Sequence, residues 1–245
     1  MLSEIKPVKL IERIYALGLG IWMPREKVLV ISDLHIGYEE ALNKEGILVP
    51  RQQFKLTKDL LEKMLAAVKP EIVVINGDLK HEFGKISEQE WRATLKILDL
   101  LSSGSKVVLV KGNHDTVLAP IARKREILIV DFYFPDRKKE VCVTHGHKIW
   151  KDADFLQAKT IIIGNEHPSV SLREGVKSEL YKCFLVGRWK GKRLIVMPSF
   201  LPIVEGTDVR KERLLSPYLK QPLGKFEVFI VGDKVYRFGK LKDLK

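Results

Sequence analysis

All six histidines of the chain, with several Asp and Asn residues, lie in short polar clusters that follow apolar runs. These residues are Asp33, His35, Asp78, His81, Asn113, His114, Asp115, His145, His147, Asn165 and His167. Oxygen donors mixed with imidazoles suit Mn, Fe, Zn or Ni better than Mg or Ca. A carboxylate such as Asp78 can bridge two ions about 3.5–4 Å apart, which clamp a phosphoryl group and activate water. The pattern therefore indicates a transition-metal centre, in which Asp78 could bridge two ions.

The polar clusters must be positioned by strands, because each one ends an apolar run. The five runs span residues 28–33, 72–78, 106–115, 141–147 and 160–167. Asp33 and His35 are two residues apart, so on an extended strand end their side chains would point the same way. Ligands of α/β sheets bind at the carboxyl ends of strands, so we expect the five clusters to meet there.

Two helices are predicted between the first three strands. Residues 51–68 carry apolar side chains at helical spacing and precede Pro70, and Ser87-x-x-Glu90 is a capping box for a helix that stops at Gly104. The alternation of strand and helix favours a sheet with parallel strands.

After about residue 125 the pattern changes to short strands and tight turns. Two hairpins are predicted, one around "KGK" at 190–192 and one around "GD" at 232–233. The chain is thus α/β in its first half and β-rich in its second half. Because no Pro, Gly or Ser-rich linker separates the halves, we predict one domain over residues 1–245.

Composition bounds the partners and the compartment. The net charge of +12, from 43 Lys+Arg against 31 Asp+Glu, suits a polyanion such as nucleic acid. A charged fraction of 30% with much Lys and Glu is also typical of thermophile surfaces.

Cys142 and Cys183 lie inside apolar runs and are predicted core residues. Without a signal peptide or membrane-spanning run, we expect a cytoplasmic protein with no membrane partner.

The motifs in their order resemble those of the calcineurin-like metallophosphoesterases. They are "DLH" at 33–35, "GD" at 77–78, "GNHD" at 112–115, "HGH" at 145–147 and "GNEH" at 164–167. This resemblance implies an α/β (α+β) four-layer sandwich, in which two packed mixed β-sheets are flanked by helices. Residues 46–50, 77–84 and 198–209 resemble a branch found beside DNA ligases and Lhr-like helicases, which implies DNA-repair, helicase or ligase partners.

The resemblance also implies a role for each site residue. It assigns the first metal to Asp33, His35 and His167, the bridge to Asp78, and the second metal to Asn113 and His145. It makes His114 the group that protonates the leaving oxygen or stabilises the transition state, with Asp115 orienting it, and the nucleophile a metal-bridging hydroxide. Apart from the resemblance, His81 and Lys80 are candidate substrate contacts or surface residues of their loop. His147 is a candidate substrate contact, a support for His145 or a further ligand of the second metal. The implied cofactors are two divalent ions, with Mn expected and Fe, Ni or Zn as alternatives.

The last motif departs from the Gly-His-x-His of the family, since it reads Gly164-Asn165-Glu166-His167. An amide oxygen is a weaker ligand than imidazole for Zn, Fe or Ni, so Asn165 predicts a second metal site that is weak or empty. Glu166 is expected to be a surface carboxylate.

Three functions are compatible with these residues. The first is a phosphodiesterase or nuclease-type hydrolase that acts on DNA, RNA or a nucleotide, as the positive charge and the branch resemblance suggest. The second is a phosphomonoesterase with the same residues. The third is a non-catalytic scaffold that binds proteins through a degraded metal site, although a scaffold has no need of His114.

Overall fold

The computed structural model describes residues 5–82, 87–115 and 125–244 of the chain. The last two residues of the stretch 77–84, which carried part of the branch resemblance, lie outside the described residues.

The first β-sheet is mixed and has seven strands among the described residues. Its order follows the chain: β1 (Val8–Ile11), β2 (Ile14–Leu17), β3 (Gly20–Met23), β4 (Val28–Ile31), β5 (Ile72–Asn76), β6 (Lys106–Val110) and β7 (Leu128–Val130). Strands β1 to β4 pair antiparallel, and β4 to β7 pair parallel. The predicted parallel arrangement of β4, β5 and β6 is therefore confirmed.

The second sheet is also mixed and has nine strands within the described part of the chain. Seven of them run in the order β14 (Thr207–Asp208), β11 (Pro168–Glu174), β12 (Lys177–Trp189), β13 (Lys192–Val196), β10 (Thr160–Ile163), β9 (Val141–Thr144) and β8 (Phe132–Tyr133). The other two, β15 (Glu227–Val231) and β16 (Val235–Lys240), join at β12. The hairpins β12–β13 and β15–β16 confirm the two turns predicted from "KGK" and "GD".

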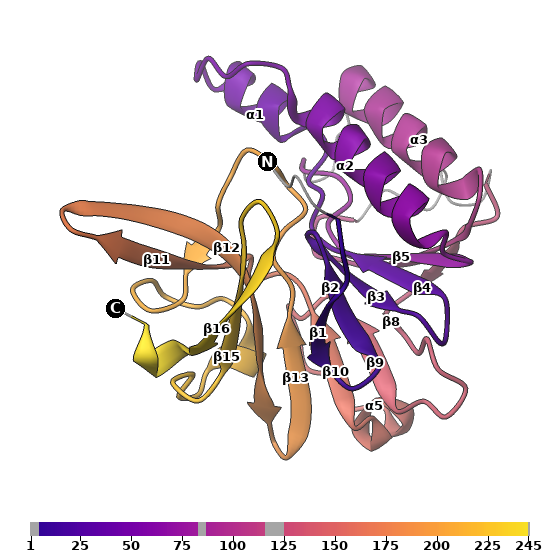
Figure 1. Ribbon diagram of the computed structural model, residues 1–245. Coiled ribbons are helices and arrows are strands. Elements are labelled where there is room, and N and C mark those ends of the chain that lie inside the picture. Colours follow the sequence, from indigo (N-terminus) through magenta and orange to yellow (C-terminus); the bar gives the residue numbers. More distant parts are fainter. Residues whose placement is uncertain (1–4, 83–86, 116–124, 245) are drawn as a thin grey trace.

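The long helices lie together on one side of the first sheet (Figure 1). They are α1 (Tyr38–Lys44), α2 (Gln53–Val68) and α3 (Glu88–Ser102). The side chain of Ser87 accepts a hydrogen bond from the backbone N–H of Glu90, so the predicted cap is confirmed. The second sheet is covered by α5 (Ala153–Gln157) and by the short 3-10 turns Pro217–Leu219 and Leu241–Asp243.

Side chains that alternate along a strand pack into two different cores, one under the helices and one between the sheets. On β4, Leu29 and Ile31 belong to the core shared with α2 and α3, whereas Val28 and Val30 belong to the core between the two sheets. Successive side chains of a strand point to opposite faces, so one run of four apolar residues serves both cores. The sandwich predicted from the resemblance, two packed mixed sheets with helices outside, is confirmed. The single domain over residues 1–245 stays a prediction.

Some elements were not anticipated from the sequence. Strands β1 to β3 form an antiparallel edge ahead of the parallel strands, and α1 follows β4 after one loop. The β11–β12 hairpin extends away from the sandwich in Figure 1. Both cysteines are buried and free, as expected of core residues.

Candidate metal centre at the strand ends

The loops that carry the predicted motifs meet because the strands that deliver them end level with one another. Ile31 of β4 pairs with Ile75 of β5, and Thr144 of β9 pairs with Ile163 of β10. Backbone hydrogen bonds continue this pairing beyond the strands. The N–H of Asp33 donates to the carbonyl of Gly77 (3.2 Å), and the N–H of Gly164 donates to the carbonyl of His145 (2.9 Å).

Two overlapping side-chain clusters form at this edge. One contains Asp33, Asp78 and His145, and the other contains Asp33, His35 and His167; in each, one ligand atom per residue lies within 4.8 Å of the others. Nε2 of His145 is 2.9 Å from Oδ1 of Asp33, and Nε2 of His167 is 3.3 Å from the same oxygen. This mixed set of oxygen and nitrogen donors suits a divalent transition metal.

The centre contains one buried atom that fits a metal directly. Nε2 of His35 is buried and has no hydrogen-bond partner among the described residues. Buried polar atoms nearly always have a partner, and leaving one unpaired costs about 1–3 kcal/mol. A cation coordinated by this nitrogen would remove that cost, so the residues present fit the metal that the motifs imply.

Two carboxylates are placed to connect the clusters. Asp33 is common to both. Oδ2 of Asp78 lies 3.8 Å from Nε2 of His35 and 3.5 Å from Nε2 of His145, which are predicted ligands of different ions. Asp78 therefore stands where a bridge is expected, and its bridging role stays a prediction.

The backbone that carries these side chains is left-handed, whereas the sequence predicted an extended strand end. The φ angles of Asp33 (55°), His35 (45°), Asp78 (45°), Asn165 (63°) and His167 (51°) are all positive. Non-glycine residues in this left-handed region cost of order 1–3 kcal/mol each, and they persist where the surroundings hold them. Tight left-handed turns, rather than the alternation of a strand, thus aim Asp33 and His35 at the same place.

Two glycines allow the loops to approach this closely. A Cβ atom on Gly164 would lie 1.9 Å from Oγ of Ser32 and 2.4 Å from Oδ2 of Asp33. A Cβ atom on Gly112 would lie 2.0 Å from Oδ1 of Asp78 and 2.4 Å from its backbone nitrogen. Both distances are far inside van der Waals contact, so each position requires glycine for steric reasons.

Electrostatics at the centre favour a cation. Burial disfavours the charge of Asp33, yet His167 and His145 hold the pKa of that carboxyl well below its usual range. Burial raises the pKa of Asp78 to about 6, and burial lowers the pKa of His35. Burial opposes protonation of His145, but the hydrogen bond and charge of Asp33 raise its pKa. The charge of a protonated His145 therefore compensates the buried carboxylates, a role that a divalent ion can take over.

The residues predicted for the second metal are less closely grouped. Asn165 is half-buried, and its backbone N–H donates to Oδ2 of Asp33 (3.0 Å). Asn113 is exposed and follows Gly112 in the loop next to Asp78. Nδ1 of His147 lies 3.0 Å from Nδ1 of His145. These positions adjoin the cluster, and a ligand role for each of them stays a prediction.

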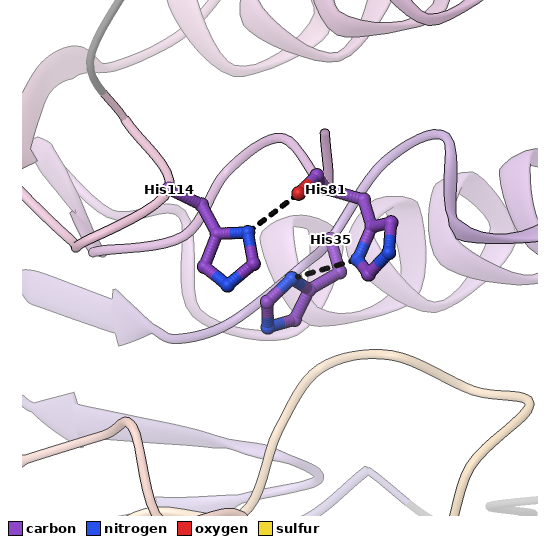
Figure 2. Close-up of side chains that lie close together, drawn as sticks. All are labelled: His35, His81 and His114. Atoms are coloured by element: carbon purple, nitrogen blue, oxygen red, sulfur yellow. Dashed lines mark hydrogen bonds between the residues drawn. The ribbon is translucent and has the colours of Figure 1, made fainter. Parts of the chain in front are cut away.

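His114 and Asp115 share a loop whose backbone is attached to Asp78. The N–H of His114 donates to Oδ1 of Asp78 (2.9 Å), and Nδ1 of its ring lies 2.5 Å from the carbonyl oxygen of His81. The carboxylate of Asp115 accepts the backbone N–H groups of Leu79 (3.1 Å) and Gly112 (3.0 Å). Asp115 thus fixes the loop that carries His114, while the carbonyl of His81 orients the ring (Figure 2).

Glu166 is not the surface carboxylate that the sequence suggested. Its side chain is buried, and its Oε2 accepts the backbone N–H groups of Leu215 (2.9 Å) and Ser216 (2.7 Å). These partners lie about fifty residues away in the chain, so no local signal revealed them. Glu166 therefore attaches a distant loop to the turn between Asn165 and His167.

Two lysines near the centre have ammonium groups that donate to backbone carbonyls. Lys80, considered above as a phosphate contact, is fully buried and its ammonium group donates to the carbonyl of Glu82. Lys182 on β12 donates to Oγ (2.7 Å) and to the carbonyl (3.1 Å) of Ser199, and burial lowers its pKa to about 7. Burial keeps Lys80 away from solvent, so a direct contact with substrate phosphate is not supported for it.

In the described part of the chain, no helix is long and apolar enough to cross a membrane.

Comparisons with known proteins agree with this centre. Residues 26–189, more than half of the chain, match the family described as calcineurin-like phosphoesterase. The comparison with curated protein sequences gave no match.

Several solved structures are similar to the chain. The nuclease MPE of Pseudomonas putida is 18% identical, with a TM-score of 0.66 over 96% of this chain and 100% of that one. Yfce, a phosphoesterase from E. coli, is 13% identical, with a TM-score of 0.39 over 87% of this chain and 97% of that one. Vps29 of Entamoeba histolytica, complexed with Zn²⁺, is 16% identical, with a TM-score of 0.39 over 86% and 97%. The likeness to the P. putida protein shows a common fold. The family match establishes that the chain belongs to the calcineurin-like phosphoesterase family and is a metal-dependent phosphoester hydrolase.

Proposed function

We propose that the chain is a phosphodiesterase that cleaves nucleic acid or a nucleotide with two divalent ions, Mn²⁺ being the expected metal. One observation carries this proposal. The side chains of Asp33, His35, Asp78, His145 and His167 meet at one edge, and a buried nitrogen of His35 lacks a partner among the described residues. Such an arrangement is costly for a protein that does not bind a cation there.

The protein residues would divide the work as follows. Two bound ions would supply Lewis acidity toward the phosphoryl oxygens and lower the pKa of water. Asp33, His35 and His167 would hold the first ion, and Asp78 would be shared with the second. His145 would give the second ion an imidazole donor, and the amides of Asn113 and Asn165 would be weaker ligands of it.

His114 is placed to act on the leaving oxygen. Its Nε2 lies 3.9 Å from Oδ2 of Asp78, and its side chain is 15% exposed, so the ring reaches from the centre toward solvent. Burial lowers its pKa, which favours the neutral ring in the metal-free protein. The negative charge of a bound phosphate favours the protonated ring, which can then donate a proton or stabilise charge.

The substrate class rests on charge and on similarity. A net charge of +12 favours a polyanion, and the P. putida protein with the common fold bears the name nuclease. Half-buried His81 and His147 border the cluster, and we retain them as substrate contacts. A cytoplasmic site of action and partners among ligases or helicases remain part of the proposal.

A substrate panel tests the proposal. Metal-free protein would be reconstituted with Mn²⁺ and assayed on bis-p-nitrophenyl phosphate, p-nitrophenyl phosphate, a labelled single-stranded DNA and the matching RNA. We expect cleavage of the diester and of at least one oligonucleotide, weakening as salt rises. Asp33→Asn, which preserves shape, is the matched control and should be inactive on every substrate.

The panel also distinguishes the other two functions. Cleavage of the monoester alone would identify a phosphomonoesterase. No cleavage of any substrate by protein that has bound two ions would favour the scaffold. Equal cleavage by the parent and Asp33→Asn would mean that another site, or a contaminant, is responsible.

A further inference from the structure

A large groove lies at the opposite end of the strands from the metal centre, and we call it the far groove. Its volume is about 1110 Å³, and residues of both sheets line it. They include Ile72 at the start of β5, and Val141 and Thr160 at the starts of β9 and β10. Because a strand rises about 3.3 Å per residue, these strands hold the far groove about 10 Å or more from the centre at their carboxyl ends.

Basic side chains outnumber acidic ones in the lining of the far groove. Seven Lys and Arg residues line it, against four Asp and Glu residues. One of the seven, Lys159, forms an ion pair with Glu140 (2.6 Å). The other six are exposed and come from three turns and one hairpin: Arg13, Arg25, Arg137, Lys138, Arg188 and Arg193.

The remaining acidic residues leave most of this charge uncompensated. Oε1 of Glu12 lies 3.8 Å from Nε of Arg13. The carboxylate of Asp136 accepts two backbone N–H groups of its own turn, and Oε2 of Glu26 is buried without a hydrogen-bond partner among the described residues. Within the described part of the chain, four arginines of the groove therefore form no ion pair: Arg25, Arg137, Arg188 and Arg193.

Two of these arginines face each other across a hairpin. Arg188 of β12 and Arg193 of β13 are directly opposite in the antiparallel register, so their side chains lie on the same face of the sheet. Like charges in this position destabilise a sheet. Arg188 donates to the carbonyl of Gly191 (3.1 Å), whereas the guanidinium of Arg193 has no hydrogen bond to another described residue. An anion bound by both guanidinium groups would turn this repulsion into attraction.

The donors of the far groove suit phosphate groups. A guanidinium presents a planar fork of N–H groups that matches two oxygens of a phosphate. No aromatic side chain occurs among the described residues that line the groove, so it offers no surface on which bases could stack. Its volume also exceeds the roughly 300–1,000 Å³ of small-molecule pockets. Repeated phosphates along a chain therefore fit the groove better than one small anion.

We infer that the far groove binds the phosphate backbone of nucleic acid, at a site separate from the metal centre. The inference concerns binding and not cleavage, so it goes beyond the proposed function and does not depend on it. The part of a nucleic acid that is held there lies at the other end of the strands from the ions and is not cut.

Binding to the metal-free protein tests the far groove without hydrolysis. In the presence of EDTA, fluorescence anisotropy would measure the affinity for a labelled DNA duplex and a labelled RNA strand as the salt concentration rises. We expect Arg137→Gln/Arg193→Gln to bind the duplex at least about tenfold more weakly near 0.1 M salt. The slope of log K against log salt should become shallower by about 1.8, because each lost phosphate contact removes about 0.9.

Lys55→Gln/Lys63→Gln is the matched control for charge. Both lysines are exposed on α2 and lie outside the far groove, and their variant loses the same two charges. It should bind the duplex within about twofold of the parent, because salt screens distant charges. Arg137→Lys/Arg193→Lys keeps both charges and should keep the salt slope of the parent. Thermal unfolding of each variant checks that it is folded.

Three results would overturn the inference. The first is that the parent binds neither nucleic acid, or binds with the same affinity and slope as Arg137→Gln/Arg193→Gln. The second is an equal loss in the groove variant and in the control on α2, which would mean that binding follows net charge alone. The third is displacement of the duplex by inorganic tripolyphosphate at the same concentration of phosphate groups, which would assign the groove to a short polyphosphate. Because EDTA removes the metal, failure here leaves the proposed hydrolysis untouched.

Discussion

Replacement of Gly112 by alanine tests whether the loop after β6 closes on Asp78 as the structure describes. The new Cβ atom would lie 2.0 Å from Oδ1 of Asp78 and 2.4 Å from its backbone nitrogen. The carboxylate could rotate away, but the backbone nitrogen belongs to the turn after β5 and has little freedom to move. The loop must therefore shift, and it takes with it the N–H of His114 that donates to Asp78.

The size of the effect follows from the overlap. Overpacking of a tight site costs about 1–3 kcal/mol, which for a chain of this length lowers the melting temperature by roughly 2–12 °C. The displaced Asp78 should also weaken metal binding, so the variant should require more Mn²⁺ for half-maximal hydrolysis. Differential scanning calorimetry of the metal-free protein and a Mn²⁺ titration of activity measure the two effects separately.

Gly104→Ala is the matched control. No atom lies within 4 Å of the position of its Cβ, and its φ lies outside the left-handed region. Surface changes of this kind usually alter stability by less than about 0.5 kcal/mol. If Gly112→Ala retained the stability and the metal dependence of Gly104→Ala, the close approach to Asp78 would be wrong.

Three further changes test the centre and its surroundings. Asn165→His should strengthen binding of the second ion about tenfold, or about 1.4 kcal/mol, because imidazole is a stronger ligand than an amide oxygen. Histidine also tolerates the left-handed φ of 63° at this position. Coinciding Mn²⁺ titration curves for the parent and the variant would refute this prediction. His114→Ala should slow esters with poor leaving groups by about 10²–10⁴-fold and nitrophenyl esters far less, and equal losses would exclude a proton-donor role. Burial lowers the pKa of Lys182 to about 7, below its unfolded value, so the folded state disfavours its charge at and below pH 7 and this cost disappears as pH rises toward 10. Lys182→Met should therefore be most stabilising, relative to the parent, at and below pH 7, and chemical denaturation from pH 6 to pH 10 should show the difference shrinking; a constant difference would contradict the argument.

The sequence predicted those features of the site and the fold that depend on residues close together in the chain. Each apolar run that ended in a polar cluster became a strand of one of the two sheets, and the ends of β4 and β5 and of β9 and β10 met as the rule for parallel strands requires. The helix cap at Ser87 and the turn at Gly191 were likewise local, and both were correctly placed, although the side chain of Glu90 accepts the N–H groups of His81 and Glu82 and not that of Ser87 as in a full capping box.

Features that depend on distant residues were not predictable in this way. Asp33 adopts a left-handed φ, and its N–H donates to the carbonyl of Gly77, which lies in the loop after β5. Glu166 is buried because Leu215 and Ser216 donate to it, and neither is near it in the chain. The orientation of His114 depends on the carbonyl of His81, whereas the motif suggested Asp115. In each case the partner lies in another loop, which strand pairing or loop packing brings close.

Counting bound manganese in the parent and in Asp78→Asn tests the two-ion account most directly. Oδ2 of Asp78 lies within 3.8 Å of Nε2 of both His35 and His145, so its loss should affect both ions while the similar shape of asparagine preserves the packing. We expect the parent to bind two ions, the second weakly, and to hydrolyse bis-p-nitrophenyl phosphate only when both are present. Asp78→Asn should bind at most one ion and show no hydrolysis above background. A variant that bound two ions and turned over within a few-fold of the parent would contradict the account.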